Sequence, residues 1–213
     1  TADPRIVPNA RKMEEVTYDE MLEMASLGAK VLHSRCVEIA KKYGVELLVC
    51  SSLNRNSGTM VREKTKMEKM LISGVAADKN VAKIRVAGLG NDPESTFRLL
   101  NLLDRNNLNI DVMIQSLGKD GTKSVSFTVA KPDMLRTIDV LNDNKDSLGI
   151  KKLDYDENVA KISVIGAGVR SHSGVAAKMF GALANAGINT EMITTSEIRI
   201  TALIDEAYAD QAM

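Results

Sequence analysis

The chain has 213 residues, of which 44% are hydrophobic and only 3% aromatic, and its 28 lysines and arginines balance 28 aspartates and glutamates. That length suits one large domain or two small ones with an ample apolar core. A neutral chain without a basic stripe gives little support to nucleic-acid binding, and no apolar run approaches the length of a membrane span. We therefore expect neither a nucleic-acid partner nor a membrane partner.

The two cysteines, Cys36 and Cys50, show neither metal-ligand spacing nor a disulfide framework. We expect reduced, buried thiols, which are typical of a cytoplasmic protein. No metal site is predicted. We also expect no signal peptide, and we interpret the chain as a piece of a longer protein because structured-looking sequence reaches both of its ends.

The first predicted helix begins at Thr17, which forms a capping box with Glu20 and is followed by an apolar helix side. Gly28 ends this helix, and Lys30 follows where its ammonium group could meet a phosphate or a ring nitrogen. A solvated lysine is the alternative. His33 has no partner for metal binding or acid–base chemistry, and we interpret it as a helix-start or packing residue.

A repeat occupies most of the remaining sequence. VAKIRVAGLG at Val81–Gly90 returns as VAKISVIGAG at Val159–Gly168, with seven of ten residues identical and an offset of 159 − 81 = 78. The extended runs Ile72–Asp78 and Ile150–Asp156 keep that offset. We expect each of these runs to be a short separate strand followed by an acidic turn, placed ahead of the repeated strand.

After its glycines each copy continues as a helix and a strand, in FRLLNLLDRNNLNIDVMIQS and AAKMFGALANAGINTEMITTS. A third strand follows at Ser124–Ala130 and Glu197–Ile204, where alternating apolar residues indicate one buried face. A second helix is predicted at Pro132–Asn142 and begins again at Ala207–Met213. The fold class is therefore α/β (α+β): in each copy a four-stranded antiparallel sheet carries two helices on one face, as in a ferredoxin-like sandwich.

The glycines that end the repeated strands admit two interpretations. Gly166-Ala167-Gly168 before a helix suggests a dinucleotide-binding loop, but a third glycine is missing and a short turn joins the next two strands, which argues against that fold. A helix N-terminus would suit a ligand carboxylate, with Asp111 and Glu191 placed to meet an ammonium group. Helix capping alone, by Asn91 or Asp92 in the first copy, is the alternative.

Several stretches together resemble the aspartate kinase (aspartokinase) family, and the resemblance covers essentially the whole chain. They are TADPRIVPNARKMEEVTYDEMLEMASLGAKVLHSRCVEIAKKYGVELLVCSS, ISGVAADKN, LNIDVMIQS, DGTKSVSFTV and VAKISVIGAGVRSHSGVAAKMFGALANAGINTEMITTSEIRI. The resemblance implies that residues 1–66 are the C-terminal part of an amino-acid-kinase α/β domain. It implies two tandem ferredoxin-like βαββαβ ACT modules at residues 67–148 and 149–213, the second without its last helix and strand.

The resemblance implies an enzyme that phosphorylates the β-carboxylate of L-aspartate with ATP, giving 4-phospho-L-aspartate on the route to lysine, threonine and methionine. ATP with Mg²⁺ is the implied co-substrate, and no tightly bound cofactor is expected. The matching ATP-side residues are Thr1, Ala2, Asp3, Pro4, Arg5, Lys30 and Val31. The family's glycine-rich kinase start and aspartate-binding residues are not in this sequence, so no catalytic set is complete and we expect the chain alone to be inactive.

The resemblance also implies that the ACT modules bind L-lysine and/or L-threonine where modules meet, causing feedback inhibition, and that the chain forms a homodimer or larger oligomer through them. The corresponding positions are Asn91, Asp92, Glu94, Ser95, Thr96, Asn109, Ile110, Asp111 and Gln115 in the first module, and Val175, Ala176, Asn189, Thr190 and Ser196 in the second. Asn91, Glu94 and Ser173 depart from the residues usual in the family. A stand-alone amino-acid-binding regulatory subunit and an assembly module without an effector are the alternatives.

Overall fold

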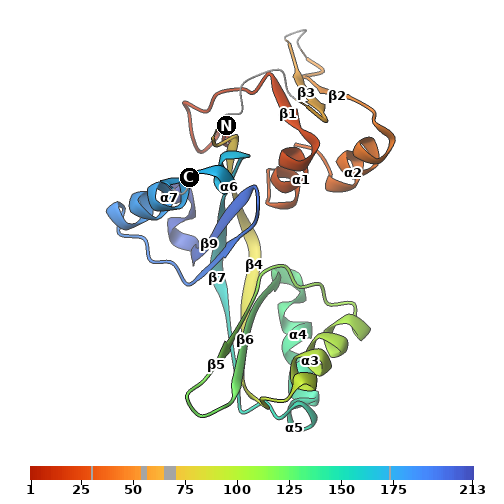
Figure 1. The fold of residues 1–213 in the computed structure, drawn as a ribbon, viewed down its shortest axis with the longest axis vertical. Coiled ribbons are helices and arrows are strands. Elements are labelled where there is room, and N and C mark those ends of the chain that lie inside the picture. Colours follow the sequence, from red (N-terminus) through yellow and green to blue (C-terminus); the bar gives the residue numbers. More distant parts are fainter. Residues whose placement is uncertain (30, 54–56, 65–70, 173) are drawn as a thin grey trace. The chain divides into compact units, whose positions relative to one another are not determined.

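The computed structural model describes residues 1–29, 31–53, 57–64, 71–172 and 174–213, which divide into two compact units (Figure 1). Asn80–Ala160 form the middle unit, and Thr1–Lys79 together with Lys161–Met213 form the terminal unit. Two long strands, β4 (Gly74–Leu89) and β7 (Lys152–Ile165), contribute residues to both units. Among the described residues, no helix is long and apolar enough to cross a membrane.

The middle unit has the predicted βαββαβ order. Its elements are the later part of β4, α3 (Pro93–Arg105), β5 (Met113–Leu117), β6 (Lys123–Ala130), the 3-10 turn η1 (Lys131–Asp133), α4 (Met134–Asp143), α5 (Lys145–Leu148) and the earlier part of β7. The strand order is β5-β6-β4-β7, and β6 is antiparallel to both of its neighbours. This arrangement is a ferredoxin-like sandwich.

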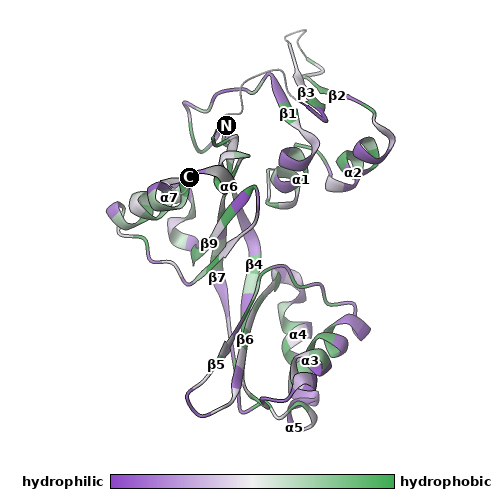
Figure 2. Cartoon of the chain, viewed as in Figure 1, coloured by the Kyte–Doolittle hydropathy of each residue, from purple (hydrophilic) through white to green (hydrophobic). Residues whose placement is uncertain are grey.

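One apolar core joins the sheet of the middle unit to its helices. Ile84 and Phe127 on the sheet are completely buried, as are Leu99 of α3 and Leu141 of α4. Both helices carry hydrophobic and hydrophilic segments in Figure 2, as expected for helices with one face on a sheet and the other in water. Full burial of each such side chain contributes about 1.5–3 kcal/mol.

The strands of the terminal unit follow the order β4-β7-β9-β8 within one six-stranded sheet, β5-β6-β4-β7-β9-β8, and β8 and β9 are antiparallel. Its elements after β7 are α6 (Gly168–Ser171), α7 (Gly174–Asn185), β8 (Met192–Thr195), β9 (Arg199–Asp205), the 3-10 turn η2 (Glu206–Tyr208) and α8 (Ala209–Ala212). The remaining strand of this order is the start of β4, which precedes the repeated strand of the first copy in the sequence.

The N-terminal part of the terminal unit is a small α/β assembly. Its elements are β1 (Glu15–Thr17), α1 (Tyr18–Ser26), α2 (Ser34–Tyr43), β2 (Leu47–Val49) and β3 (Thr59–Arg62). The strand order is β1-β3-β2, with β1 parallel and β2 antiparallel to β3. Thr17 and Glu20 form the predicted capping box, and the ring of His33 accepts a hydrogen bond from the N–H of Arg35, so both predicted helix starts are confirmed.

The expectation of short strands separated by acidic turns is wrong. β4 and β7 run without interruption through Asp78 and Asp156. Asp78 lies 3.2 Å from the ammonium group of Lys161, whose side chain is only 6% exposed. The charge of Asp78 is thus balanced within the sheet, which removes the need for a solvated turn.

The two repeated strands exchange partners in a symmetric way. In the terminal unit, the N–H of Ser73 donates to the carbonyl of Ile165 at 2.8 Å. In the middle unit, the N–H of Lys151 donates to the carbonyl of Ala87 at 2.9 Å. Lys151 comes 78 positions after Ser73 (151 − 73), and Ala87 comes 78 positions before Ile165 (165 − 87), so the second bond joins the repeat equivalents of the first. Each repeated strand therefore pairs with the run that precedes the other copy.

The prediction of buried thiols is also wrong, because Cys36 and Cys50 are free but exposed. On α2 the buried face is formed by Val37 and Ala40, which leaves Cys36 on the side toward solvent. Cys50 directly follows β2, a strand with β3 as its only neighbour in the described sheet. Sequence context does not reveal which side of a helix or strand faces water when the apolar pattern is weak.

The glycines of the second copy allow two stretches of main chain to touch. A Cβ atom at Gly166 would lie 2.6 Å from the carbonyl oxygen of Leu71, and one at Gly168 would lie 2.5 Å from the same atom. The N–H of Gly168 donates to that oxygen at 3.1 Å. Glycine is required here for close backbone approach.

We predict that Gly168→Ala destabilises the protein by about 1–3 kcal/mol, because the new methyl group collides with main chain that cannot rotate away. Gly181→Ala, on α7, is the matched control, since a Cβ there meets nothing within 4 Å. It should stabilise the helix by about 0.5–1 kcal/mol. Urea denaturation of both variants measures the difference, and equal midpoints would contradict the steric argument.

Candidate functional site

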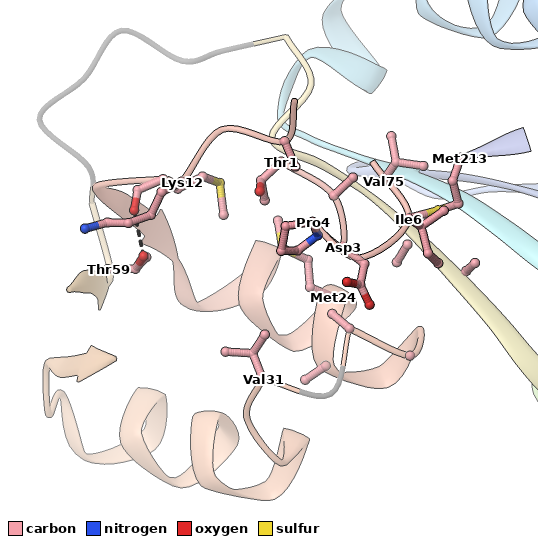
Figure 3. A pocket seen from close by; sticks show the side chains of 18 of the residues that line it. Thr1, Asp3, Pro4, Ile6, Lys12, Met24, Val31, Thr59, Val75 and Met213 are labelled. Carbon is pink, nitrogen blue, oxygen red and sulfur yellow. Dashed lines mark hydrogen bonds between the residues drawn. The ribbon is translucent and has the colours of Figure 1, made fainter. Parts of the chain in front are cut away.

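A cavity of about 610 Å³ lies in the terminal unit (Figure 3). The loop Thr1–Ile6 forms one wall, α1 contributes Met21, Met24 and Ala25, and the start of β4 contributes Val75–Ala77. The segment after α1 also lines it, through Gly28, Ala29, Val31 and Leu32. The cavity thus brings together the predicted ATP-side residues Thr1, Ala2, Asp3, Pro4, Arg5 and Val31, while Lys30 lies outside the described residues.

The N-terminal loop is held by its own hydrogen bonds. The carbonyl of Thr1 accepts from the N–H of Val75 at 2.8 Å, and the carbonyl of Asp3 accepts from the N–H groups of Ile6 and Val7 at 3.1 and 2.8 Å. The carboxylate of Asp3 accepts three hydrogen bonds from the Arg5 guanidinium, from Nε at 3.0 and 3.2 Å and from Nη2 at 2.6 Å. These side-chain bonds lower the pKa of Asp3 to about 2 and raise the pKa of Arg5.

The turn after α1 approaches β4 closely. Gly28 has a φ of +97°, and a Cβ there would lie 2.5 Å from the carbonyl oxygen of Ala77. The predicted helix break at Gly28 is therefore confirmed, and it places Val31 at the cavity (Figure 3). Methionine and valine side chains make one side of this cavity apolar, and Arg5 and Lys12 add two cationic side chains to its lining.

The described lining of the cavity offers few ligands to a divalent cation. Within the described residues, no group of three or more histidine, cysteine, aspartate or glutamate side chains could hold a metal ion. Asp3, the carboxylate at the cavity, is engaged by Arg5. The described lining thus combines apolar side chains with two cationic ones and offers no set of metal ligands.

Some cavity residues had no signature in the sequence. Lys12, Met24 and Met213 line the cavity but were not among the predicted site residues. The spacing of Met21 and Met24 on one side of α1 is the signal that could have revealed that side. Lys12 donates to the main-chain oxygen of Ser57, a long-range contact that only the fold reveals.

The predicted effector positions of the first module gather at the start of α3. Asp92 is the N-cap, accepting from the N–H of Glu94 at 3.0 Å, and Pro93 is the first helical residue. Ser95 is buried, and its hydroxyl donates to the carbonyl of Asp92 at 3.1 Å. Lys123 of β6, absent from the sequence-based set, donates to the same carbonyl at 2.7 Å.

A second contact joins α3 to the edge strand β5. The hydroxyl of Thr96 donates to Oε1 of Gln115 at 2.6 Å. Asn109 and Asp111 are exposed in the loop before β5, and the N–H of Asp111 donates to the carbonyl of Thr128 at 3.1 Å. The structure therefore brings Thr96 and Gln115 together near the start of α3. Asp111 lies at the other end of the sheet, because Thr128 pairs with Lys83 whereas Leu89, just before α3, pairs with Lys123.

The second module repeats part of this arrangement. The N–H of Glu191 donates to the carbonyl of Leu203 at 2.8 Å, the counterpart of the Asp111 bond. Asn189 is exposed, Thr190 and Ala176 are half-buried, and Val175 is buried in the core. Ser196 begins the turn into β9, where its N–H donates to the carbonyl of Arg199 at 2.8 Å. Ser173 lies outside the described residues.

A small α/β segment with a cavity, followed in the chain by ferredoxin-like modules with polar helix starts, is the class of protein that this fold defines. The model of the amino acid kinase family matches residues 1–51, and that of the ACT domain matches residues 162–213. An aspartokinase of Pseudomonas aeruginosa is 41% identical over 216 residues, covering 100% of this chain and 52% of that protein.

Solved structures agree. The regulatory subunit of aspartate kinase from Thermus thermophilus is 31% identical with a TM-score of 0.63, covering 67% of this chain and 94% of that one. Aspartokinase III of E. coli, in complex with aspartate and ADP, is 26% identical with a TM-score of 0.87, covering 100% of this chain and 47% of that one. Its complex with lysine and aspartate gives the same identity and coverage with a TM-score of 0.79.

The chain belongs to the aspartate kinase family. It spans about half the length of the curated relatives it matches, 52% in the Pseudomonas aeruginosa protein. The α/β fold with ACT modules and an amino-acid-kinase segment, predicted from the sequence, is thereby confirmed.

The ion pair between Asp3 and Arg5 can be tested by titrating the Asp3 carboxyl group. In Arg5→Ala the pKa of Asp3 should rise from about 2 toward its ordinary value of 3.8, because the hydrogen bonds from the guanidinium are lost. The folded-state pKa is the lower one, so the contribution of the pair to folding is present above the ordinary pKa and is lost as the pH falls toward 2. Carboxyl NMR titration measures it, and an unchanged Asp3 midpoint would exclude the pair in solution.

Proposed function

We propose that this chain is the ATP-side end of the kinase domain and the regulatory region of an aspartate kinase. The intact enzyme would transfer the γ-phosphoryl group of ATP to the β-carboxylate of L-aspartate, giving 4-phospho-L-aspartate on the route to lysine, threonine and methionine. The cavity that unites the Thr1–Arg5 loop with Val31 carries this proposal. The ADP complex of the E. coli relative supports it.

In this proposal the chain's own residues position the nucleotide. The methionine side of α1 and Val31 receive the base, and the guanidinium of Arg5 and the ammonium of Lys12 meet anionic oxygens of the nucleotide. Mg²⁺ bound with ATP would neutralise charge on the phosphates. Phosphoryl transfer depends on positioning and charge stabilisation, so the chain needs the remaining kinase residues for turnover.

We further propose that L-lysine and/or L-threonine bind at the helix starts of the modules and inhibit the kinase. Thr96 and Gln115 lie together near the start of α3. The exposed carboxylates of Asp111 and Glu191 occupy equivalent places before β5 and β8, where they would meet the ammonium group of a ligand bound between modules. An effector that binds one arrangement more tightly shifts the population toward it. The lysine complex of the E. coli relative supports this assignment.

Assembly through the modules is part of the same proposal. The edge strand β5 is exposed at every position, and it presents Met113, Ile114 and Leu117 to solvent. Such an edge is a template for pairing with another strand. We propose a homodimer or larger oligomer of a cytoplasmic enzyme, with a second copy pairing at this edge.

A second candidate is a free-standing regulatory subunit. It is favoured by the Thermus thermophilus subunit, of which this chain covers 94%. The amino-acid-kinase match at residues 1–51 argues for the kinase interpretation, because a purpose-built regulatory subunit has no use for that segment.

Effector binding can be measured on the chain itself. Calorimetry and thermal unfolding with lysine, threonine or both should show binding, and ligand at 100 times its dissociation constant should raise the unfolding free energy by about 2.7 kcal/mol. Gln115→Ala should weaken the first-module site, whereas Gln211→Ala, an exposed position on α8, should not. Silence with every amino acid would favour an assembly module without an effector.

Turnover tests the kinase proposal. The 213-residue chain should show no aspartate-dependent ATP consumption, because half of the positioning groups are missing. In the intact kinase, Arg5→Ala should lower kcat/KM for ATP about tenfold or more, as expected for the loss of a charged hydrogen bond. Arg11→Ala, an exposed arginine that does not line the cavity, should stay within about twofold of the unsubstituted enzyme. Equal effects of the two substitutions would refute the role of Arg5.

A further inference from the structure

Three stretches of main chain meet at one place in the terminal unit. They are the run Leu71–Ser73 before β4, the glycine corner Gly166–Gly168, and the turn 196–199 between β8 and β9. The N–H of Ser73 donates to Ile165, that of Gly168 to Leu71, and that of Gly166 to Ile198, at 2.8, 3.1 and 2.9 Å. We call these three stretches the corner junction.

Two carboxylates of α1, one helical turn apart, bind side chains of the corner junction. Glu20 is buried and accepts a hydrogen bond from the hydroxyl of Ser73. Oε2 of Glu23 accepts from Nη1 of Arg199 at 2.9 Å, with the side chains 26% and 20% exposed. A partly buried ion pair of this kind is screened much less than a surface pair.

The same helix lines the cavity on another side, through Met21, Met24 and Ala25. Met24 also reaches the start of β4, where its terminal methyl carbon would lie 3.0 Å from a Cβ on Gly74. Figure 3 shows Met24 among the side chains around the cavity. A movement of α1 therefore changes the cavity directly, because close-packed side chains move together.

The other end of this connection reaches a predicted effector residue. Ser196 opens the turn that Arg199 closes, and the N–H of Ser196 donates to the carbonyl of Arg199 at 2.8 Å. A ligand that reorders this four-residue turn alters the backbone from which the Arg199 side chain extends.

The contact between Glu23 and Arg199 is a single hydrogen bond, because Nε of Arg199 is buried without an acceptor in the described part of the chain. It is therefore easier to break than a two-point guanidinium–carboxylate contact.

We infer that Glu23 and Arg199 are positioning residues. They couple the turn 196–199 of the second module, which begins at the predicted effector residue Ser196, to the nucleotide cavity, and α1 is the element that moves. The inference rests on the proposed function, because it needs an effector at the module and a nucleotide at the cavity. Neither residue lines the cavity or belongs to the proposed effector set. Their role is to transmit effector binding to the cavity, so replacing them should weaken inhibition by the amino acid and leave uninhibited catalysis nearly unchanged.

The test uses the intact kinase with lysine and threonine as inhibitors. Arg199→Met should keep uninhibited kcat/KM for ATP within about twofold, and it should raise the amino acid concentration for half-inhibition at least fivefold, the lower range of measured couplings. Arg199→Lys, which keeps the charge, should lose less. The exchange Glu23→Arg with Arg199→Glu should restore sensitivity, which a merely structural defect would not do.

Lys79→Met is the matched control, because it removes a cation of the same unit whose pair with Asp210 is exposed. It should leave inhibition unchanged. Inhibition of Arg199→Met equal to that of the unsubstituted enzyme overturns the coupling role while the proposed function stands. Absence of inhibition by either amino acid in the unsubstituted enzyme overturns the proposed effector function and the coupling together.

Discussion

The exchange of strand partners between the two repeats is the constraint on which the rest of the structure depends. Each repeated strand pairs with the run that precedes the other copy, as the Ser73–Ile165 and Lys151–Ala87 bonds show. The terminal unit is therefore built from two separate stretches of sequence, whereas the middle unit is the continuous stretch Asn80–Ala160. The close approach of Leu71 to Gly166 and Gly168 follows from this pairing, and with it the need for glycine at these positions.

The exchange also explains how a kinase segment comes to touch a regulatory module. The start of β4 belongs to the sheet of the terminal unit and lines the cavity through Val75–Ala77. Helix α1 packs on it, with Ala76 and Ile165 in the same core cluster as Val16 and Met24. The start of β4 therefore connects this sheet directly to the lining of the cavity.

The two modules share a fold, but the surroundings of their first helices differ. In the first, the start of α3 is already engaged by its own chain, through Asp92, Lys123 and the Thr96–Gln115 bond. In the second, main chain rather than side chains fills the glycine corner. An internal repeat conserves the positions that build the sheet, while side chains around each helix start are free to diverge, so equivalent places need not bind equivalent ligands.

Local pattern in the sequence determined the elements and the order of each module. The capping box of Thr17 and Glu20, the helix break at Gly28, the N-cap at Asp92 and the alternation of Val125 and Phe127 depend on neighbours a few residues away, and each was predictable. The ATP-side residues followed from the family resemblance.

Tertiary structure alone decided that Asp78 sits inside a continuous strand opposite Lys161, that Cys36 and Cys50 face water, and that Glu23 meets Arg199 across 176 residues. Such contacts depend on which distant strand lies alongside, and no local periodicity encodes that.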